Sequence, residues 1–409
     1  MGATDCRESA VIIGAGQAGG WAARTLRSEG FTGRIVLIGD EPVPPYERPP
    51  LSKEQLQQGA PALASLLGAA DLAAHDIEWR GDTACLRIDR VGRQVLLADG
   101  SSVAYDKLLL CTGGRPRLPA IAGIDAPCVH TLRTVADADR LRQALRGGAR
   151  VLVIGGGWIG LEVAAAARKA GCAVTLVEAG ARLCARTGSA QLSDFLTRLH
   201  RERGVEFHFN ASVVAVEEGA RAGWRAVLAD GRALTVDLVV VGIGLIPNDE
   251  LADAAGLACE RGIVVDHQCR TADPAIFAAG DVAALKDHDG TLLRLESWQN
   301  AQDQAIWAAR AMLGLQVDYR PAPFFWSQQY ETMVQIAGTC RPGARIVTRE
   351  VDSERVLIAE LDADGRLLCA ISTNSPREFR QLRKFVAAGM RVDAARFKDP
   401  TVPLTGISA

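Results

Sequence analysis

The stretch VIGGGWIGLE occupies residues 153–162, and a similar stretch, IIGAGQAGG, has already occurred at residues 12–20. Each follows a short aliphatic run and precedes an alanine-rich segment. This order indicates a strand, a tight glycine turn and a helix. Two copies of the unit in one chain predict two domains of the same kind, and a length of 409 residues is sufficient for both.

The first unit begins with the aliphatic run AVIIG, which we expect to form a strand. Gly14, Gly16 and Gly19 follow, and the helix is expected to continue to about Ser28. The first glycine permits the turn, the second lets the backbone approach a pyrophosphate, and the third lets the helix pack on the strand. The phosphates would then lie at the positive end of the helix. A second strand, RIVLIGD, ends at Asp40, whose carboxylate is placed to accept hydrogen bonds from a ribose, with Glu41 as the neighbouring candidate.

The second unit repeats the first. The strand RVLVIG leads into Gly155, Gly157 and Gly160, a helix is expected through Lys169, and the strand AVTLVE ends at Glu178. Two complete units predict two bound dinucleotides. An acid at Glu178 accepts the free hydroxyls of NADH and repels the additional phosphate of NADPH, so the sequence predicts NADH. Arg182 and Arg186 lie just beyond Glu178. They either weaken the preference for NADH or are solvated charges of a loop.

Two further aliphatic strands end in glycine, KLLLCTGGRPR at 107–117 and DLVVVGIGLIPN at 237–248. We expect each to return the chain beneath a bound nucleotide. In PAIFAAGDVA, Asp281 follows a strand and a glycine. Its carboxylate would either hold a ribitol hydroxyl of a flavin or cap a helix without any ligand.

Composition excludes several classes of protein. A net charge of −2 with 48% hydrophobic residues indicates neither a nucleic-acid-binding protein nor a membrane protein. The polar opening residues favour a cytoplasmic location. None of the ten cysteines forms a CxxC or CxxxxC pair. We therefore expect ten reduced thiols and no metal site or iron-sulfur cluster.

The order of these motifs resembles the FAD-dependent pyridine-nucleotide reductases of the glutathione-reductase fold. More narrowly, PPYERPPLSK at 44–53, ESWQNAQDQ at 296–304 and FFWSQQY at 324–330 are similar to the ferredoxin reductase components of bacterial aromatic-ring dioxygenase systems. Their putidaredoxin-reductase-like relatives usually lack the tryptophan of ESW, so Trp298 favours the dioxygenase group.

The resemblance implies an α/β fold with two Rossmann-like dinucleotide-binding domains and a small α+β C-terminal interface domain. It implies an FAD-binding domain of residues 1–116 and 248–322, an NADH-binding domain of 117–247 and a C-terminal domain of 323–409.

Position by position, the resemblance also implies two sets of contact residues. Those for FAD are Gly14, Gly16, Gly19, Asp40, Arg48, Lys53, Arg133, Asp281 and Trp298. Those for NADH are Gly155, Gly157, Ile159, Gly160, Glu178 and Gly244. In such enzymes the lysine of PPLSK lies beside the flavin and pairs with the glutamate that closes GGGWIGLE, here Lys53 and Glu162.

Three positions of this chain qualify the resemblance. Trp326 would pack near the flavin, with a purely structural core position as the alternative. Gln328 stands where related sequences commonly have the aspartate of WSDQ, which puts any role of that position in doubt. Cys111 replaces the usual alanine before TGG and is expected to be a small core residue.

The disulfide reductases of this fold carry a CxxxxC pair after the second strand, whereas this chain has EPVPPYERPPLSK there, without cysteine. A flavin would then be the only redox centre, accepting hydride from NADH and passing single electrons to a ferredoxin, expected to be of the Rieske type. Two alternatives remain: a reductase serving the ferredoxin of a haem monooxygenase or a rubredoxin, and an NADH-responsive sensor resembling apoptosis-inducing factor. A basic run between residues 377 and 398 is either a docking face for an acidic ferredoxin or a solvated helix face.

Overall fold

The computed structural model describes residues 8–186, 188–219, 223–341 and 343–409. The chain divides into two compact units. The first comprises the described residues up to Arg48, Ala62–Arg115 and Leu245–Pro321, and the second comprises Pro49–Pro61, Pro116–Gly244 and Ala322–Ala409. The short strands β8 (Gly114–Pro116) and β17 (Leu245–Pro247), where the chain passes from one unit to the other, pair in a two-stranded sheet.

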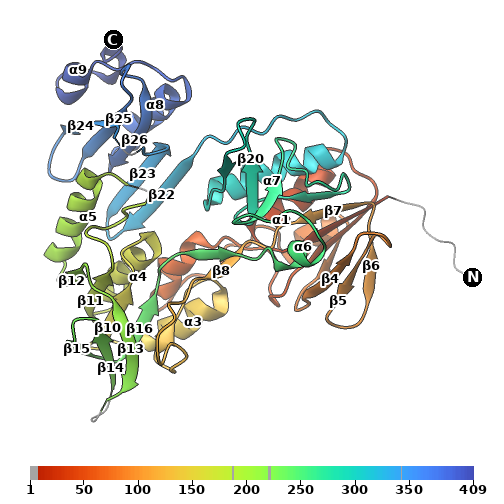
Figure 1. The fold of residues 1–409 in the computed structure, drawn as a ribbon, viewed down its shortest axis with the longest axis horizontal. Coiled ribbons are helices and arrows are strands. Elements are labelled where there is room, and N and C mark those ends of the chain that lie inside the picture. The colour runs from red at the N-terminus through yellow and green to blue at the C-terminus, as the bar shows by residue number, and fades with distance from the viewer. Residues whose placement is uncertain (1–7, 187, 220–222, 342) are drawn as a thin grey trace, which may run out of the picture. The chain divides into compact units, whose positions relative to one another are not determined.

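The first unit is built on a five-stranded parallel sheet. Its strands are, in spatial order, β19 (Ile276–Ala278), β7 (Lys107–Leu110), β1 (Ser9–Ile13), β2 (Arg34–Ile38) and β3 (Ile77–Arg80). The central strand SAVII is almost wholly aliphatic, as a parallel strand buried on both faces requires. Helix α1 (Gln17–Ser28) contacts β1 and β2, and α7 (Trp298–Met312) packs against α1 (Figure 1).

The second unit is also built on a five-stranded parallel sheet. Its parallel sheet has the order β12 (Val205–Phe209), β11 (Ala173–Glu178), β10 (Arg150–Ile154), β16 (Leu238–Val241) and β9 (Val129–His130). Helix α4 (Trp158–Lys169) follows β10 as α1 follows β1. The two strand–turn–helix units predicted from the glycine stretches are therefore confirmed, including the helix ends at Ser28 and Lys169.

Residues 324–373 form an antiparallel sheet in the order β22 (Phe324–Gln329), β23 (Thr332–Gly338), β26 (Leu367–Thr373), β25 (Val356–Leu361) and β24 (Arg345–Glu350). Helix α8 (Pro376–Ala387) packs on β23 and β26, and α9 (Ala394–Lys398) packs on β24 (Figure 1). Leu357, Leu382 and Phe397 are fully buried between these helices and the sheet. The predicted C-terminal α+β region is confirmed, and the motif FFWSQQY proves to be mostly strand β22.

Smaller elements complete both units. In the first unit they are β4 (Cys85–Asp89), β5 (Gln94–Leu97), β6 (Ser102–Ala104), β18 (Ile263–Val265), β20 (Ala283–Lys286), β21 (Leu292–Leu293), α2 (Ala69–Ala74) and α6 (Glu250–Ala254). In the second unit they are β13 (Val213–Glu218), β14 (Trp224–Leu228), β15 (Ala233–Val236), α3 (Val135–Ala144), α5 (Ala190–Glu202) and the 3-10 turns η1 (Pro49–Ser52), η2 (Glu54–Leu56) and η3 (Leu404–Gly406).

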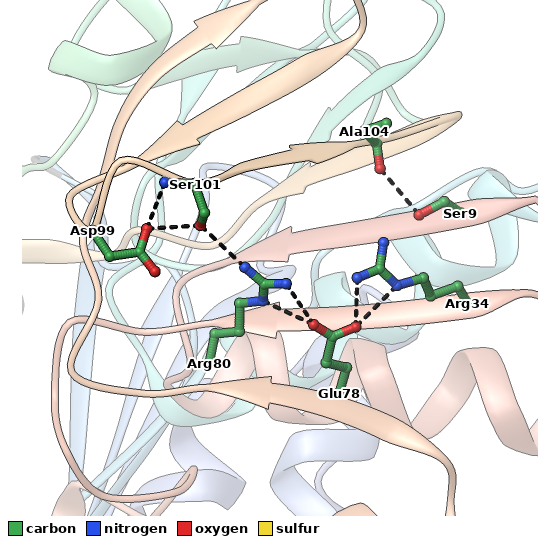
Figure 2. A network of polar contacts seen from close by, with 7 residues as sticks. All are labelled: Ser9, Arg34, Glu78, Arg80, Asp99, Ser101 and Ala104. Atoms are coloured by element: carbon green, nitrogen blue, oxygen red, sulfur yellow. Dashed lines mark hydrogen bonds and ion pairs between the residues drawn. The ribbon is translucent and has the colours of Figure 1, made fainter. Parts of the chain in front are cut away.

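A polar network connects the edge of the first unit's main sheet to the turn between β5 and β6 (Figure 2). The Glu78 carboxylate accepts hydrogen bonds from Arg34 at 2.6 Å and from Arg80 at 2.8 Å, and Arg80 also donates to Ser101 at 3.2 Å. Burial alone would raise the pKa of Glu78, but the two guanidinium groups lower it below its ordinary value. Because these side chains are partly exposed, each pair contributes at most about 1 kcal/mol.

No helix within the described ranges is long and apolar enough to cross a membrane. The nine cysteines in those ranges are free thiols in this structure, and the tenth, Cys6, lies outside them.

Candidate functional site

The first glycine turn leaves room beside a helix N-terminus. Gly14 has φ +104°, and a Cβ there would lie 2.1 Å from the carbonyl oxygen of Cys111, so only glycine fits. A Cβ on Gly19 would collide with the Gly14 carbonyl oxygen. Gly16 differs, because a Cβ there would meet only the Arg48 guanidinium, at 3.8 Å. A pyrophosphate fits this arrangement, since it would face both the amide groups of α1 and a cation.

Arg48 is held in place by two neighbours on the same segment. Its guanidinium donates to Glu41 at 2.7 Å and to the Tyr46 hydroxyl at 3.0 Å, and Tyr46 in turn donates to Glu41 at 2.7 Å. Burial lowers the pKa of Arg48, but Tyr46, Glu41 and Asp281 together raise it above its ordinary value. Glu41 is therefore occupied by Arg48 and Tyr46, which leaves the exposed Asp40 as the candidate for the ribose.

Asp281 and Trp298 lie in the first unit. Asp281 precedes the strand β20, so the alternative in which it caps a helix is wrong. Trp298 is the first residue of α7, and Gln17 is the first residue of α1, directly after the glycine turn. In the amide orientation that satisfies its partners, the Gln17 oxygen accepts from the indole Nε1 of Trp298 at 2.9 Å and of Trp21 at 3.1 Å. The Trp298 indole is thereby fixed beside the first glycine turn.

The second glycine turn has the same construction. Gly155 has φ +105°, and a Cβ there would lie 2.6 Å from the Gly242 carbonyl oxygen. A Cβ on Gly160 would collide with Gly155, whereas Gly157 again faces open space, with its nearest neighbour at 3.8 Å. Ile159, on the first turn of α4, is 44% exposed although it is a large apolar residue. A second dinucleotide fits here for the same reason as the first.

The Glu178 carboxylate lies at the end of β11, directly beside this turn. One oxygen accepts from the backbone amide of Gly156 at 2.6 Å, and the other accepts from that of Gly180 at 2.7 Å. The carboxylate is thus fixed where a ribose would lie, as its place after the strand predicts. Arg182 donates to the backbone carbonyls of Gly188 and Ala185, which supports the loop-charge interpretation for this residue.

Gly244, which the resemblance places in contact with NADH, lies in the loop after β16. It has φ +118°, and a Cβ there would lie 3.2 Å from a guanidinium nitrogen of Arg186. Arg186 thus lies next to the loop that follows β16. Gly242 in the same loop contacts Gly155 of the second glycine turn.

A buried ion pair joins Lys53 to Glu162 within the second unit. The ammonium of Lys53 lies 2.8 Å from Oε2 of Glu162, and the two side chains are 15% and 4% exposed. Lys53 also donates to the backbone carbonyl of Pro49 at 2.9 Å. Ser52 donates a short hydrogen bond to the same carboxylate oxygen, and Ser327 donates to the other at 2.6 Å. A buried carboxylate is tolerated when paired and hydrogen-bonded in this way.

The hydrogen bonds continue inward from Ser327. Gln329 Nε2 donates to the Ser327 hydroxyl at 3.1 Å, and Gln329 Oε1 lies 2.8 Å from Nε2 of His200. Since an amide oxygen can only accept, His200 carries its proton on Nε2, and Nδ1 faces the Tyr330 hydroxyl at 3.4 Å. Burial lowers the pKa of His200 to about 4, so the ring is neutral near pH 7.

Sequence reasoning missed four members of this network, namely Ser52, Ser327, Gln329 and His200. The available signal was the alternation of a strand, because Ser327 and Gln329 are buried on β22 while Gln328 between them is exposed. The departure from WSDQ therefore falls on the solvent-facing position of the motif.

The remaining predicted residues lie in the second unit. Trp326, on β22, is half-buried and stacks with Phe324 at 5.9 Å between ring centroids. The backbone amide of Arg133 donates to Asp137 at the start of α3, at 2.9 Å. Neither contact by itself assigns a cofactor role.

Comparisons with known proteins agree with this architecture. Residues 8–305 match the family described as pyridine nucleotide-disulphide oxidoreductase, and residues 324–408 match the one described as reductase C-terminal. The chain is 38% identical over 394 residues to the ferredoxin–NAD(+) reductase component of the p-cumate 2,3-dioxygenase system of Pseudomonas putida, which covers 96% of this chain and 97% of that protein. It is 43% identical over 387 residues to rhodocoxin reductase of Rhodococcus erythropolis, covering 93% and 90%.

A solved structure is similar over nearly the whole chain. The reductase in the covalent putidaredoxin reductase–putidaredoxin complex matches with a TM-score of 0.92 at 38% identity, covering 97% of each chain. These matches confirm the resemblance inferred from the motifs and the predicted fold class. The chain belongs to the pyridine nucleotide-disulphide oxidoreductase family, in the group that carries a reductase C-terminal domain.

Proposed function

We propose that the protein is an NADH:ferredoxin oxidoreductase. The observation that carries this proposal is the presence of two glycine turns, each with open space at the start of a helix, in two parallel sheets that share the order of four strands, β7-β1-β2-β3 and β16-β10-β11-β12. The names of its relatives support the proposal, since one is a ferredoxin–NAD(+) reductase component and another occurs in a complex with putidaredoxin. In this assignment residues 1–116 and 248–322 bind FAD, 117–247 bind NADH, and 323–409 form the C-terminal domain.

FAD, when bound, supplies a centre that accepts two electrons as hydride and releases them singly. The chain's own residues position and neutralise it. Arg48 and the first turn of α1 would hold the pyrophosphate, Asp40 the ribose and Asp281 the ribitol, while Gly14, Gly19, Arg133, Trp298 and Trp326 would complete the site. Lys53 would place a positive charge near the flavin ring, where negative charge develops on reduction. Glu162 keeps that ammonium in one position.

NADH would bind at the second glycine turn, with Gly155, Gly157, Gly160 and Gly244 around the phosphates and Ile159 against the nicotinamide half. Glu178 would accept hydrogen bonds from the adenosine ribose. No side chain needs to donate or remove a proton for hydride transfer, which agrees with the buried, neutral state of His200.

We propose a Rieske-type ferredoxin of a dioxygenase system as the electron acceptor. The exposed basic side chains of α8 and its surroundings support an acidic partner; they are Arg377, Arg380, Arg383, Lys384, Arg391, Arg396 and Lys398. Identity alone does not choose the acceptor, because the dioxygenase component and rhodocoxin reductase are similarly related to this chain.

Two measurements test the proposal. The purified protein should be yellow, and under anaerobic conditions NADH should bleach it much faster than NADPH does. Stopped-flow reduction should then be followed with a Rieske ferredoxin, a ferredoxin of a haem monooxygenase and a rubredoxin in parallel. Fastest transfer to the Rieske ferredoxin supports the proposal, and fastest transfer to another acceptor corrects the partner alone. A flavin that NADH does not reduce would refute the enzyme assignment.

A further inference from the structure

Three potential metal ligands converge on one face of the C-terminal sheet. Glu360 on β25 is directly opposite Cys369 on β26, and Cys369 is in turn opposite Gly338, the last residue of β23. Cys340 follows Gly338 by two residues. Side chains that face each other across neighbouring strands lie on the same side of a sheet. The fold thus gathers residues whose spacing in the sequence gave no metal-binding signal.

The ligand atoms of these residues are already close. The sulfur atoms of Cys340 and Cys369 lie 3.1 Å apart, and with a carboxylate oxygen of Glu360 they all fall within 4.8 Å of one another. Cys369 is fully buried and Glu360 is 3% exposed, whereas Cys340 is half-buried. One side of the group is therefore open to solvent.

Glu360 is a buried carboxylic acid among these potential ligands. Among the residues that the structure describes, its hydrogen bond comes from the backbone amide of Arg341 at 3.1 Å and not from a basic side chain. Burying a carboxylate that has only a backbone hydrogen bond costs free energy, and a bound divalent cation would offset that cost. Two sulfur ligands and one oxygen ligand suit zinc, which takes four ligands in a tetrahedral arrangement.

We propose that Cys340, Glu360 and Cys369 form a zinc site whose fourth position is open to water. Ligands around tetrahedral zinc lie about 3.5–3.8 Å apart, so the two sulfur atoms need to separate by only about 0.6 Å. The site lies outside both glycine turns and is separate from the proposed redox function.

A disulfide between the two cysteines is the competing outcome. Disulfide formation needs a two-electron oxidant, whereas zinc binding needs only the release of the thiol protons. Because zinc binding releases thiol protons, zinc affinity should rise with pH.

The test uses the full-length holoprotein after treatment with a chelator. Zinc chloride is titrated in competition with a chromophoric chelator, and bound zinc is counted by atomic emission. We expect one zinc per chain, and the Cys340→Ala and Glu360→Gln variants should each lose at least about tenfold in affinity. An unchanged flavin spectrum verifies that the variants fold. Bound zinc should also protect Cys340 from alkylation by iodoacetamide.

Two control variants make the assignment specific. Cys259→Ala removes another half-buried cysteine, and His288→Ala disrupts a second group of potential ligands, formed by His267, Asp287 and His288. Both should bind zinc as the unaltered protein does. The proposal is overturned if Cys340→Ala retains full affinity, if His288→Ala alone loses the zinc, or if mass spectrometry finds a disulfide between Cys340 and Cys369 in the chelator-treated protein.

Discussion

Lys53 and Glu162 form a buried ion pair with 2.8 Å between Nζ and Oε2, although 109 residues separate them in the chain. Lys53 follows the turn η1, and Glu162 lies on α4. Hydroxyl groups of Ser52 and Ser327 donate to the two carboxylate oxygens, so the pair is held from both sides. A buried pair fixed in this way specifies one position for the ammonium.

Replacing Glu162 should therefore harm stability and activity together. Glu162→Gln leaves the Lys53 ammonium buried without its counter-charge, which should lower the free energy of unfolding by about 3 kcal/mol. Reduction of the flavin by NADH should slow by at least about tenfold, because the ammonium loses its fixed position. Chemical denaturation and anaerobic stopped-flow absorbance measure the two effects.

A matched control is Glu217→Gln, which breaks the exposed pair of Glu217 with Arg225 at 2.7 Å in the same unit. That change should cost at most about 1 kcal/mol and leave the rate unaltered. Equal stability of the two variants would show that the buried pair does not hold Lys53.

On β22, the buried serine should matter more than the neighbouring departure from the family motif. Ser327→Ala removes the hydroxyl that donates to Glu162 at 2.6 Å and accepts from Gln329, at a cost of about 1–3 kcal/mol. Gln328→Asp restores the carboxylate of WSDQ at an exposed position and should change stability by less than about 0.5 kcal/mol. Thermal unfolding of both variants decides the ranking, and a larger loss in Gln328→Asp would contradict it.

The sequence was sufficient to predict features that depend on residues close together in the chain. Aliphatic runs ending in spaced glycines identified both Rossmann units, because the turn after β1 excludes any side chain at Gly14. The Lys53–Glu162 pair came only from the family resemblance, since no spacing connects those residues. Ser52, Ser327 and His200 were missed because each lies on a different element, and only the packing of α4, α5 and β22 brings them into one network.

The nucleotide preference should depend on Glu178. In Glu178→Gln one amide nitrogen must face a backbone N–H, because the carboxylate accepts from both Gly156 and Gly180. The KM for NADH should rise, and the ratio of kcat/KM for NADH over NADPH should fall by about 10- to 100-fold. Glu206→Gln, at an exposed position on the adjacent strand β12, should leave that ratio unchanged. A preference retained in Glu178→Gln would exclude this carboxylate as the ribose ligand.

His200 should make the protein lose stability in acid. Burial lowers its pKa in the folded protein to about 4 from an ordinary value of 6.5, so the unfolded chain binds more protons between these two values. The stability that neutral His200 contributes is fully present above about pH 6.5 and is lost as the pH falls to about 4, a total of about 3 kcal/mol. His200→Asn cannot take up that proton, so its unfolding free energy should fall less steeply with decreasing pH.

Exposed His288 offers the control, because His288→Asn should keep the steep dependence of the unaltered protein. Urea denaturation from about pH 7.5 to about pH 4.5 measures the difference, and parallel curves for His200→Asn and the unaltered protein would show that His200 does not titrate in this way.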